Sequence, residues 1–238
     1  MVRKESMQRL STVNVPTDDI HYIHYYFYHQ DLSYCLNKYA GGELLDIGCG
    51  NKPYKVLIEQ KVNKYIGCDI IQSSENCVDI ICDASNIPLP ADHFDTIICT
   101  QTIEHVEQHQ LLINEAFRLL KPGGKFILSG PMYWPLHEEP YDFFRFTKHG
   151  FGYILRKAGF EILEQKSNGG KWSLCGQVII QTIYPHLNKR KTFKWKVLRF
   201  VVNKLMGGIK GVSEFFIKMD VREKDEKNTM NYVFVATK

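Results

Sequence analysis

The sequence has no apolar run of the roughly 18 to 20 residues that cross a bilayer, which argues against an integral membrane protein. Its first residues contain no apolar core of signal-peptide length, so we do not expect secretion. The seven cysteines are odd in number and form no CxxC pair. Because Cys68, Cys82 and Cys99 lie within apolar runs, we expect buried, reduced thiols and a cytoplasmic protein.

The chain also lacks a strong overall charge. Its 238 residues include 30 Lys and Arg against 26 Asp and Glu, a formal net charge of +4. The charge is uneven, since residues 186–210 hold eight Lys and Arg and no acid, which leaves 22 basic against 26 acidic residues elsewhere. With 44% hydrophobic and 24% charged residues, the composition is that of an ordinary globular protein.

What the sequence does contain is a regular alternation of short apolar strands and helices. Strands that are apolar on both sides and alternate with helices indicate an α/β fold with a doubly wound, mostly parallel sheet. The pattern predicts an aromatic-rich helix at 21–39, further helices at 54–60, 111–120 and 146–158, and strands at 43–47, 64–69, 78–83, 94–99, 125–129, 160–164 and 231–236.

About 60 residues separate the last two predicted strands, far more than a connecting loop needs. Apolar residues at helical spacing, broken by Gly207-Gly208, predict helices there. We therefore expect one domain in four parts, namely an N-terminal helical cap (1–42), a core (43–166), a helical insertion (167–229) and a last strand (230–238).

Three acidic residues follow or end neighbouring predicted strands, where doubly wound sheets bind ligands. Asp46 precedes the loop Gly48-Cys49-Gly50, whose glycines let backbone approach a ligand. Asp69 ends the second strand, placed to accept hydrogen bonds from ribose hydroxyls, and Asp83 ends the third. This arrangement predicts a nucleoside site; caps or solvated turn residues are the alternative interpretation.

The charge pattern decides which nucleoside the site favours. A dinucleotide motif needs a third glycine, and this chain has Pro53 there. Asp46 just before the loop would repel a pyrophosphate but would attract the ammonium and sulfonium of S-adenosylmethionine. The residues therefore favour S-adenosylmethionine over NAD.

Four segments, LLDIGCGNKPY, YIGCDI, IICDASNIPLPADHFDTIICTQTIEHV and LKPGGKFILSGP, together resemble the successive motifs of class I S-adenosylmethionine-dependent methyltransferases of the small-molecule subgroup. The resemblance covers about residues 40 to 165 and the last strand. It implies a seven-stranded Rossmann-like sheet whose last strand is antiparallel beside the sixth. It also implies cofactor contacts at the methionine end, ribose, adenine and sulfonium, from Asp46, Gly48, Cys49, Gly50, Asp69, Ile70, Asp83, Ala84, Thr100 and Gln101.

The segment HEEPYDFFRFT at 137–147 resembles, more narrowly, methyltransferases of bacterial polysaccharide biosynthesis. Two features depart from the family pattern. Lys52 stands where a small residue is usual, and the insertion before the last strand is large. The glycine loop is therefore expected to have a different shape.

Two histidines are candidate general bases for methyl transfer to oxygen, because both lie on loops expected to overhang the strand ends. They are His105 and His137. Tyr141 and Arg145 are candidate ligands of a polar or anionic substrate. The alternatives are a helix-start histidine bonded to backbone for His105, a solvated loop residue for His137, and an ion pair with Glu138 or Asp142 for Arg145.

The acceptor is constrained only in part. Methyltransferases that act on exocyclic amino groups typically have a sequence resembling Asn/Asp-Pro-Pro-Tyr/Phe after the fourth strand. This chain has Thr100-Gln101-Thr102-Ile103 there, which disfavours an exocyclic amine as the methyl acceptor. No cluster has metal-ligand spacing, so we expect no catalytic metal. The leading hypothesis is transfer to oxygen of a small molecule or glycan. The alternatives are RNA methylation through residues 186–210 and a non-catalytic binding protein.

The basic amphipathic segment 189–206 has several possible partners. It could contact a membrane surface or a lipid-linked substrate. It could instead cover the active site or form a homodimer interface.

Overall fold

The computed structural model describes residues 9–187, 193–223 and 225–238. These divide into two compact units. We call residues 31–166 and 231–238, with the segment ending at Val13, the sheet unit. Residues 14–30 and 167–230 form the helical unit.

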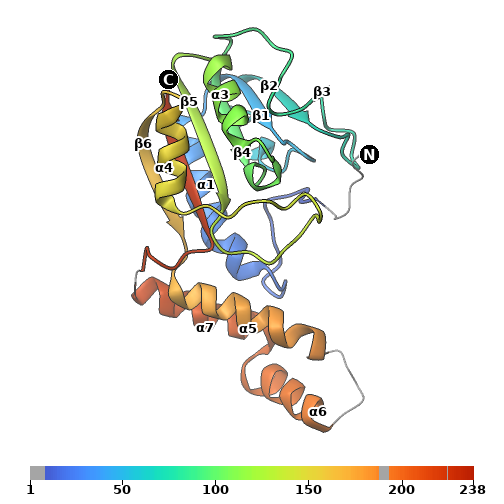
Figure 1. Ribbon diagram of the computed structural model, residues 1–238. Helices are drawn as coiled ribbons and strands as arrows, with labels where there is room; N and C mark the ends of the chain where they lie inside the picture. The colour runs from blue at the N-terminus through green and yellow to red at the C-terminus, as the bar shows by residue number, and fades with distance from the viewer. Residues whose placement is uncertain (1–8, 188–192, 224) are drawn as a thin grey trace. The chain divides into compact units, whose positions relative to one another are not determined.

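Within the described residues, the strands form one seven-stranded sheet in the order β3-β2-β1-β4-β5-β7-β6 (Figure 1). The pairs among β1 to β5 are parallel, whereas β7 runs antiparallel to β5 and lies between β5 and β6. The predicted fold class and the antiparallel last strand are confirmed. The strands are β1 (Gly42–Ile47), β2 (Val62–Asp69), β3 (Ile80–Ile81), β4 (Phe94–Thr100), β5 (Leu120–Pro131), β6 (Glu161–Asn168) and β7 (Asn231–Thr237).

The helices α3 (His109–Leu119) and α4 (Lys148–Lys157) lie against the sheet (Figure 1). Apolar residues of α3 at helical spacing, among them Leu112, Ala116 and Leu119, are buried. Since α3 and α4 share one apolar cluster with the strands, burial of these residues stabilises the sheet unit.

Several predicted boundaries were wrong at the ends of elements. The helix expected at 54–60 is only α2 (Lys55–Ile58), and the strand expected at 78–83 is only the two residues of β3. Pro122-Gly123-Gly124 lies inside β5, because Leu120 already pairs with Phe94 and an irregularity in the register accommodates Gly123 at φ +80°. The helix predicted from 146 starts at Lys148, where the Thr147 side chain accepts a hydrogen bond from the Gly150 N–H.

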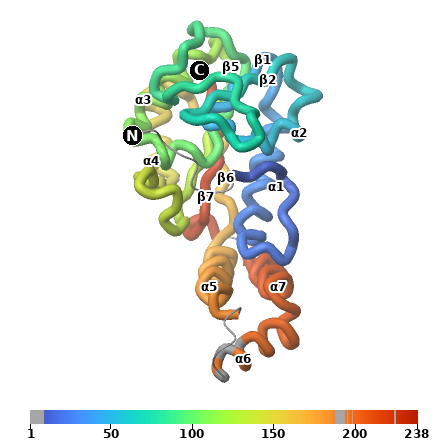
Figure 2. The backbone as a smooth tube through the Cα atoms, turned by 90° about the vertical axis from the view of Figure 1, so that its right-hand side faces the viewer, coloured from blue at the N-terminus to red at the C-terminus, as the bar shows by residue number. Residues whose placement is uncertain are grey.

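The helical unit contains the predicted helices of the insertion, with α5 (Lys171–Leu187) and α7 (Gly208–Arg222) side by side (Figure 2). The buried Asp220 of α7 accepts hydrogen bonds from the first backbone N–H groups of α5, at Gly170, Trp172 and Ser173. A carboxylate there satisfies unpaired donors and the positive end of the helix dipole. Gly207, at φ +74°, separates α7 from the π-helix η2 (Val201–Leu205), as the sequence predicted.

Two further helices complete the described chain. They are α1 (Tyr22–Tyr39), the predicted aromatic helix, and α6 (Phe193–Phe200) in the insertion. Residues 188–192, part of the predicted basic segment, lie outside the described residues, as do the side chains of Phe193, Trp195 and Leu198. Every described helix is too short or too polar to span a bilayer.

Candidate functional site

The loop after β1 depends on its two glycines. Gly48 and Gly50 have φ values of +73° and +49°, which favour glycine. A Cβ on Gly48 would also collide with the Thr102 side chain. The loop is held in place by the backbone N–H groups of Gly48 and Cys49, which both donate to the Cys68 carbonyl on β2. The loop therefore follows β1 at the carboxyl edge of the sheet.

Asp46 is a buried carboxylate that is only partly satisfied. It is 1% exposed, and its Oδ2 accepts a hydrogen bond of 2.5 Å from the Tyr65 hydroxyl. Its Oδ1 has no hydrogen-bond partner in the described structure. Burial raises the pKa of Asp46 to about 7, although the Tyr65 bond works in the opposite direction. A cation placed here would favour the ionised form.

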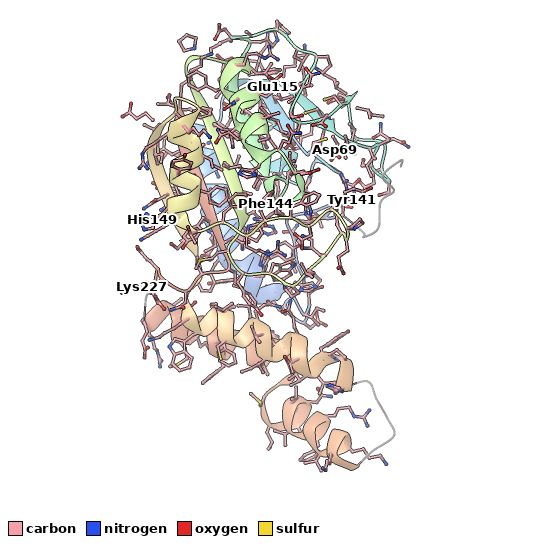
Figure 3. The ribbon with its side chains drawn as sticks, in the orientation of Figure 1. Asp69, Glu115, Tyr141, Phe144, His149 and Lys227 are labelled. Carbon is pink, nitrogen blue, oxygen red and sulfur yellow. The ribbon has the colours of Figure 1, made fainter. Side chains whose placement is uncertain are left out.

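Asp69 ends β2 directly beside the glycine loop (Figure 3). Its Oδ2 accepts from the Gly50 N–H at 3.1 Å and from Arg9 Nη1 at 2.5 Å. The sequence predicted the place of Asp69 but not the ion pair with Arg9. Arg9 therefore lies where a hydroxyl of a bound nucleoside would donate to this carboxylate.

Other predicted cofactor residues have different surroundings. Asp83 is exposed, and its Oδ1 accepts from the Ser85 N–H and hydroxyl, as expected for a turn residue. Ile70 is 40% exposed. Lys52 has φ +53°, so the backbone at this position of the loop adopts the left-handed conformation that glycine favours.

Thr100 ends β4 and Gln101 follows with φ +50°, an unusual conformation for a residue other than glycine. The Gln101 N–H donates to the Ser129 carbonyl of β5. Thr102 then contacts Gly48, and the short 3-10 helix η1 (Ile103–His105) follows. This turn brings the ends of β1, β4 and β5 to one place.

His105 faces the loop after β5. Its Nδ1 lies 2.8 Å from the Tyr141 carbonyl, as the backbone-bonded alternative predicted. Its ring also packs edge-to-face on the His137 ring, with 4.7 Å between centroids. The structure therefore brings together the two histidines that sequence analysis singled out. Burial lowers the pKa of His105, which favours the neutral ring.

Glu104, which sequence analysis did not predict, completes this group. It is 1% exposed, and neither carboxylate oxygen has a hydrogen-bond partner in the described structure. Its Oε1 lies 3.9 Å from His105 Nε2. Burial raises the pKa of Glu104 to about 8. We call Glu104, His105 and His137 the Glu–His cluster.

The loop that carries His137 is organised by Asp142 and Arg145. Asp142 accepts from Arg145 Nη1 and Nη2 at 2.6 and 2.7 Å and from the His137 N–H at 3.0 Å. Although burial alone would raise it, the bond from Arg145 and the other donors bring the pKa of Asp142 to about 2. Arg145 also donates to the carbonyls of Trp134, Phe144 and Pro135. Its charge is thus paired within the loop, as the ion-pair alternative for Arg145 predicted.

In the Glu–His cluster, Glu104 and its neighbour His105 meet His137, which is distant in sequence, and one ligand atom from each lies within 4.8 Å of the others. The spacing argument against a metal therefore does not hold for these residues. Glu104 and His105 lie in η1, shortly after β4, and His137 lies in the loop after β5. They approach one another because β4 and β5 are adjacent in the sheet. Tyr141 and Phe144 mark the loop in Figure 3.

Comparisons with known proteins show what the sheet unit is similar to. Residues 45–128 match a family described as a methyltransferase domain. The chain is 28% identical over 154 residues to a probable S-adenosylmethionine-dependent methyltransferase of Mycolicibacterium smegmatis, covering 58% of this chain and 60% of the relative. It is 26% identical over 132 residues to the ubiquinone biosynthesis O-methyltransferase of Psychrobacter arcticus, covering 49% of each protein. These alignments span less than two thirds of either relative.

Among solved structures, the cyclase SpnF superimposes with a TM-score of 0.57 at 18% identity, covering 90% of this chain and 81% of that protein. This likeness shows the fold alone. The match of residues 45–128 and the relatives show that the chain contains an S-adenosylmethionine-dependent methyltransferase domain, and the sheet order is the one expected for class I.

The residues at the strand ends fit S-adenosylmethionine. The free Oδ1 of Asp46 is a buried acceptor without a donor, as a site for a cationic ligand requires. Gly48 and Gly50, both at positive φ, leave the backbone at these two positions without a side chain. The carboxylate of Asp69 is held toward the loop by the Gly50 N–H. The site thus offers negative charge and open backbone at one edge of the sheet.

Proposed function

We propose that this protein transfers a methyl group from S-adenosylmethionine to an oxygen atom of a small molecule or glycan. The observation that carries the proposal is the presence of two buried, under-satisfied carboxylates at one edge of the sheet. Asp46 belongs to the cofactor end and Glu104, beside two histidines, to the acceptor end. An acceptor group next to a cationic cofactor is the arrangement that methyl transfer needs.

The cofactor end would hold S-adenosylmethionine by charge and hydrogen bonds. Asp46 attracts the cationic methionine part, and the backbone at Gly48 to Gly50 accommodates it closely. Asp69 accepts from the ribose hydroxyls once Arg9 has moved from its Oδ2. Cys49, Ile70, Asp83, Ala84, Thr100 and Gln101 complete the proposed contacts.

When bound, S-adenosylmethionine supplies an electrophilic methyl group whose bond to sulfur breaks as the acceptor oxygen bonds to carbon, while the hydroxyl proton leaves. The chain's own task is to orient the acceptor and assist loss of that proton. We assign this task to His105 and His137. An oxygen acceptor is supported by their imidazoles and by the absence of the amine-type motif at residues 100–103.

Tyr141 and Arg145 are proposed to shape the acceptor side through their loop. Tyr141 supplies the carbonyl opposite His105 Nδ1, and Arg145 fixes Asp142 beside His137. The resemblance of residues 137–147 to polysaccharide-associated methyltransferases supports a glycan acceptor. Arg145→Lys is expected to weaken acceptor binding by loosening this loop.

The decisive test is calorimetry with S-adenosylmethionine, followed by a methyl-donor assay over sugars, small alcohols and RNA. Asp69→Asn is expected to lose about 10-fold or more in cofactor affinity, because a charged hydrogen-bond acceptor is removed. Asp92→Asn is the matched control, since Asp92 is 55% exposed and precedes β4 at the opposite edge. No cofactor binding by the wild type, or equal binding by both variants, would contradict the proposal.

A contact with an anionic membrane surface, which would suit a lipid-linked acceptor, is a second proposal for the basic insertion. It is supported by large apolar side chains that are exposed beside lysines on α6 and η2. These are Val197, Phe200 and Leu205, at 45%, 59% and 72% exposure, with Lys194, Lys196 and Lys204 nearby in sequence. Such a surface combines apolar insertion with attraction to anionic headgroups.

Co-sedimentation with vesicles containing phosphatidylserine tests this surface. Phe200→Ser with Leu205→Ser is expected to reduce binding at least several-fold, because two inserting side chains are lost. If the wild type sedimented equally with anionic and with neutral vesicles, the proposed contact with an anionic membrane surface would be contradicted. A dimer that forms as the protein concentration rises would favour a homodimer interface at this segment. RNA binding that is lost as salt increases would favour RNA as the partner.

A further inference from the structure

The Glu–His cluster has the composition of a cation site. It offers a carboxylate from η1, an imidazole from the next residue, and an imidazole from the loop after β5. The ligand atoms lie within 4.8 Å of one another. Tetrahedral bonds of about 2.1 Å would separate ligand atoms by about 3.4 Å, so the cluster would close by about an ångström around an ion.

Both histidines have their Nδ1 atoms already oriented by acceptors. His105 Nδ1 lies 2.8 Å from the Tyr141 carbonyl. His137 Nδ1 lies 3.1 Å from Asp142 Oδ2 and 3.2 Å from the Pro135 carbonyl. Because these partners are all acceptors, Nδ1 carries the proton and Nε2 presents a lone pair. A ring held in this way by a carboxylate or carbonyl is typical of metal-bound histidine.

Glu104 supplies an independent observation. Its side chain is 1% exposed and its two oxygens accept no hydrogen bond in the described structure. Its Oε1 lies 3.9 Å from His105 Nε2, so the carboxylate points into the cluster. The guanidinium of Arg145 is paired with Asp142. A buried carboxylate without donors is costly unless a cation compensates it.

We propose that Glu104, His105 and His137 bind a divalent transition-metal ion, such as Zn²⁺, Co²⁺ or Mn²⁺. Two imidazoles and one carboxylate favour these ions over Mg²⁺ and Ca²⁺, which prefer oxygen ligands. Three protein ligands leave coordination positions open for an acceptor hydroxyl. The inference deepens the proposed function and its catalytic role rests on it. In the metal-bound protein His105 and His137 would act as ligands in place of general bases. The metal would lower the pKa of that hydroxyl, whose proton passes to water.

The test is titration of the metal-stripped protein with Co²⁺, followed by visible absorption and calorimetry. The wild type is expected to bind one ion per chain. Glu104→Gln and His137→Gln should each weaken binding at least 10-fold. His149→Gln is the matched control because His149 is an exposed histidine on α4 and should bind Co²⁺ as the wild type does (Figure 3). Circular dichroism establishes that each variant is folded.

Absence of stoichiometric binding, with or without S-adenosylmethionine, would overturn the inference, as would unchanged binding in both ligand variants. Calorimetry with S-adenosylmethionine on the same metal-stripped protein separates the two proposals. If the cofactor binds and methyl transfer survives chelation, the metal site is wrong while the proposed function stands. If Co²⁺ binds but S-adenosylmethionine does not, the metal site stands while the proposed function is wrong.

Discussion

Each end of the proposed site contains a buried acid with a carboxylate oxygen that accepts no hydrogen bond in the described structure, but the two ends are built differently. Asp46 lies within β1. Its neighbours are Tyr65, on the parallel strand β2, and Gly48, in the loop that follows β1. Glu104 lies after a strand, and its backbone carbonyl is bound by a loop of irregular backbone. A regular sheet is sufficient to place the first carboxylate, whereas the second depends on two loops packing together.

The largest expected effect comes from separating the two ends by mutation. Glu104→Gln should lower kcat/KM for methyl transfer about 100-fold or more while the affinity for S-adenosylmethionine changes less than about 3-fold. Calorimetry and initial rates on the same preparation measure both quantities. A parallel loss of cofactor affinity would show that the ends are coupled.

Asp46→Asn should have the opposite profile. Cofactor affinity is expected to fall about 10-fold, because the charge that attracts the ligand is removed. The apo protein should become more stable at pH 8, by on the order of 2 kcal/mol or about 4 to 8 °C in Tm, because an ionised buried carboxylate no longer has to be desolvated. An unchanged melting temperature would contradict the assignment of the raised pKa to burial.

Asp46 also predicts a pH dependence of cofactor binding. Its pKa of about 7 reflects burial and Asp69, opposed by Tyr65 and Lys52. Below pH 7 the carboxyl is protonated and neutral, so affinity for the cationic cofactor should rise as pH increases from 6 to 8, with release of a proton on binding. Calorimetry in buffers of different ionisation enthalpy measures that proton. Asp46→Asn should remove this dependence.

The smallest expected effect concerns Arg9. Its guanidinium occupies Oδ2 of Asp69, so Arg9→Ala should raise cofactor affinity by about 3-fold, because a partly buried, charged hydrogen bond no longer has to be broken. Arg9→Lys retains the positive charge, so its affinity for S-adenosylmethionine should lie nearer that of the wild type. A loss of affinity in Arg9→Ala would mean that Arg9 supports the bound cofactor instead.

The sequence predicted where Asp46, Asp69 and the glycine loop lie in the sheet, because those signals are local. Alternation of strands and helices places Asp46 and Asp69 at strand ends, and the glycines between them require a turn. Glu104 carried no such signal. Its type and position suggest a solvated acid at a helix start. In the structure its side chain is buried close to Gly130 of β5, and its backbone carbonyl binds a loop whose path no periodicity describes. The pairing of Arg145 with Asp142 was undecided for the same reason.

The backbone of Glu104 links these two loops as well. Its carbonyl accepts from the N–H groups of Phe143 at 2.9 Å and Phe144 at 3.3 Å. Two amides in a loop without regular secondary structure are thereby shielded from solvent, and their hydrogen exchange reports whether the loop stays docked. Glu104→Gln retains that carbonyl, so slow exchange at Phe143 and Phe144 would distinguish a loss of carboxylate chemistry from a displaced loop.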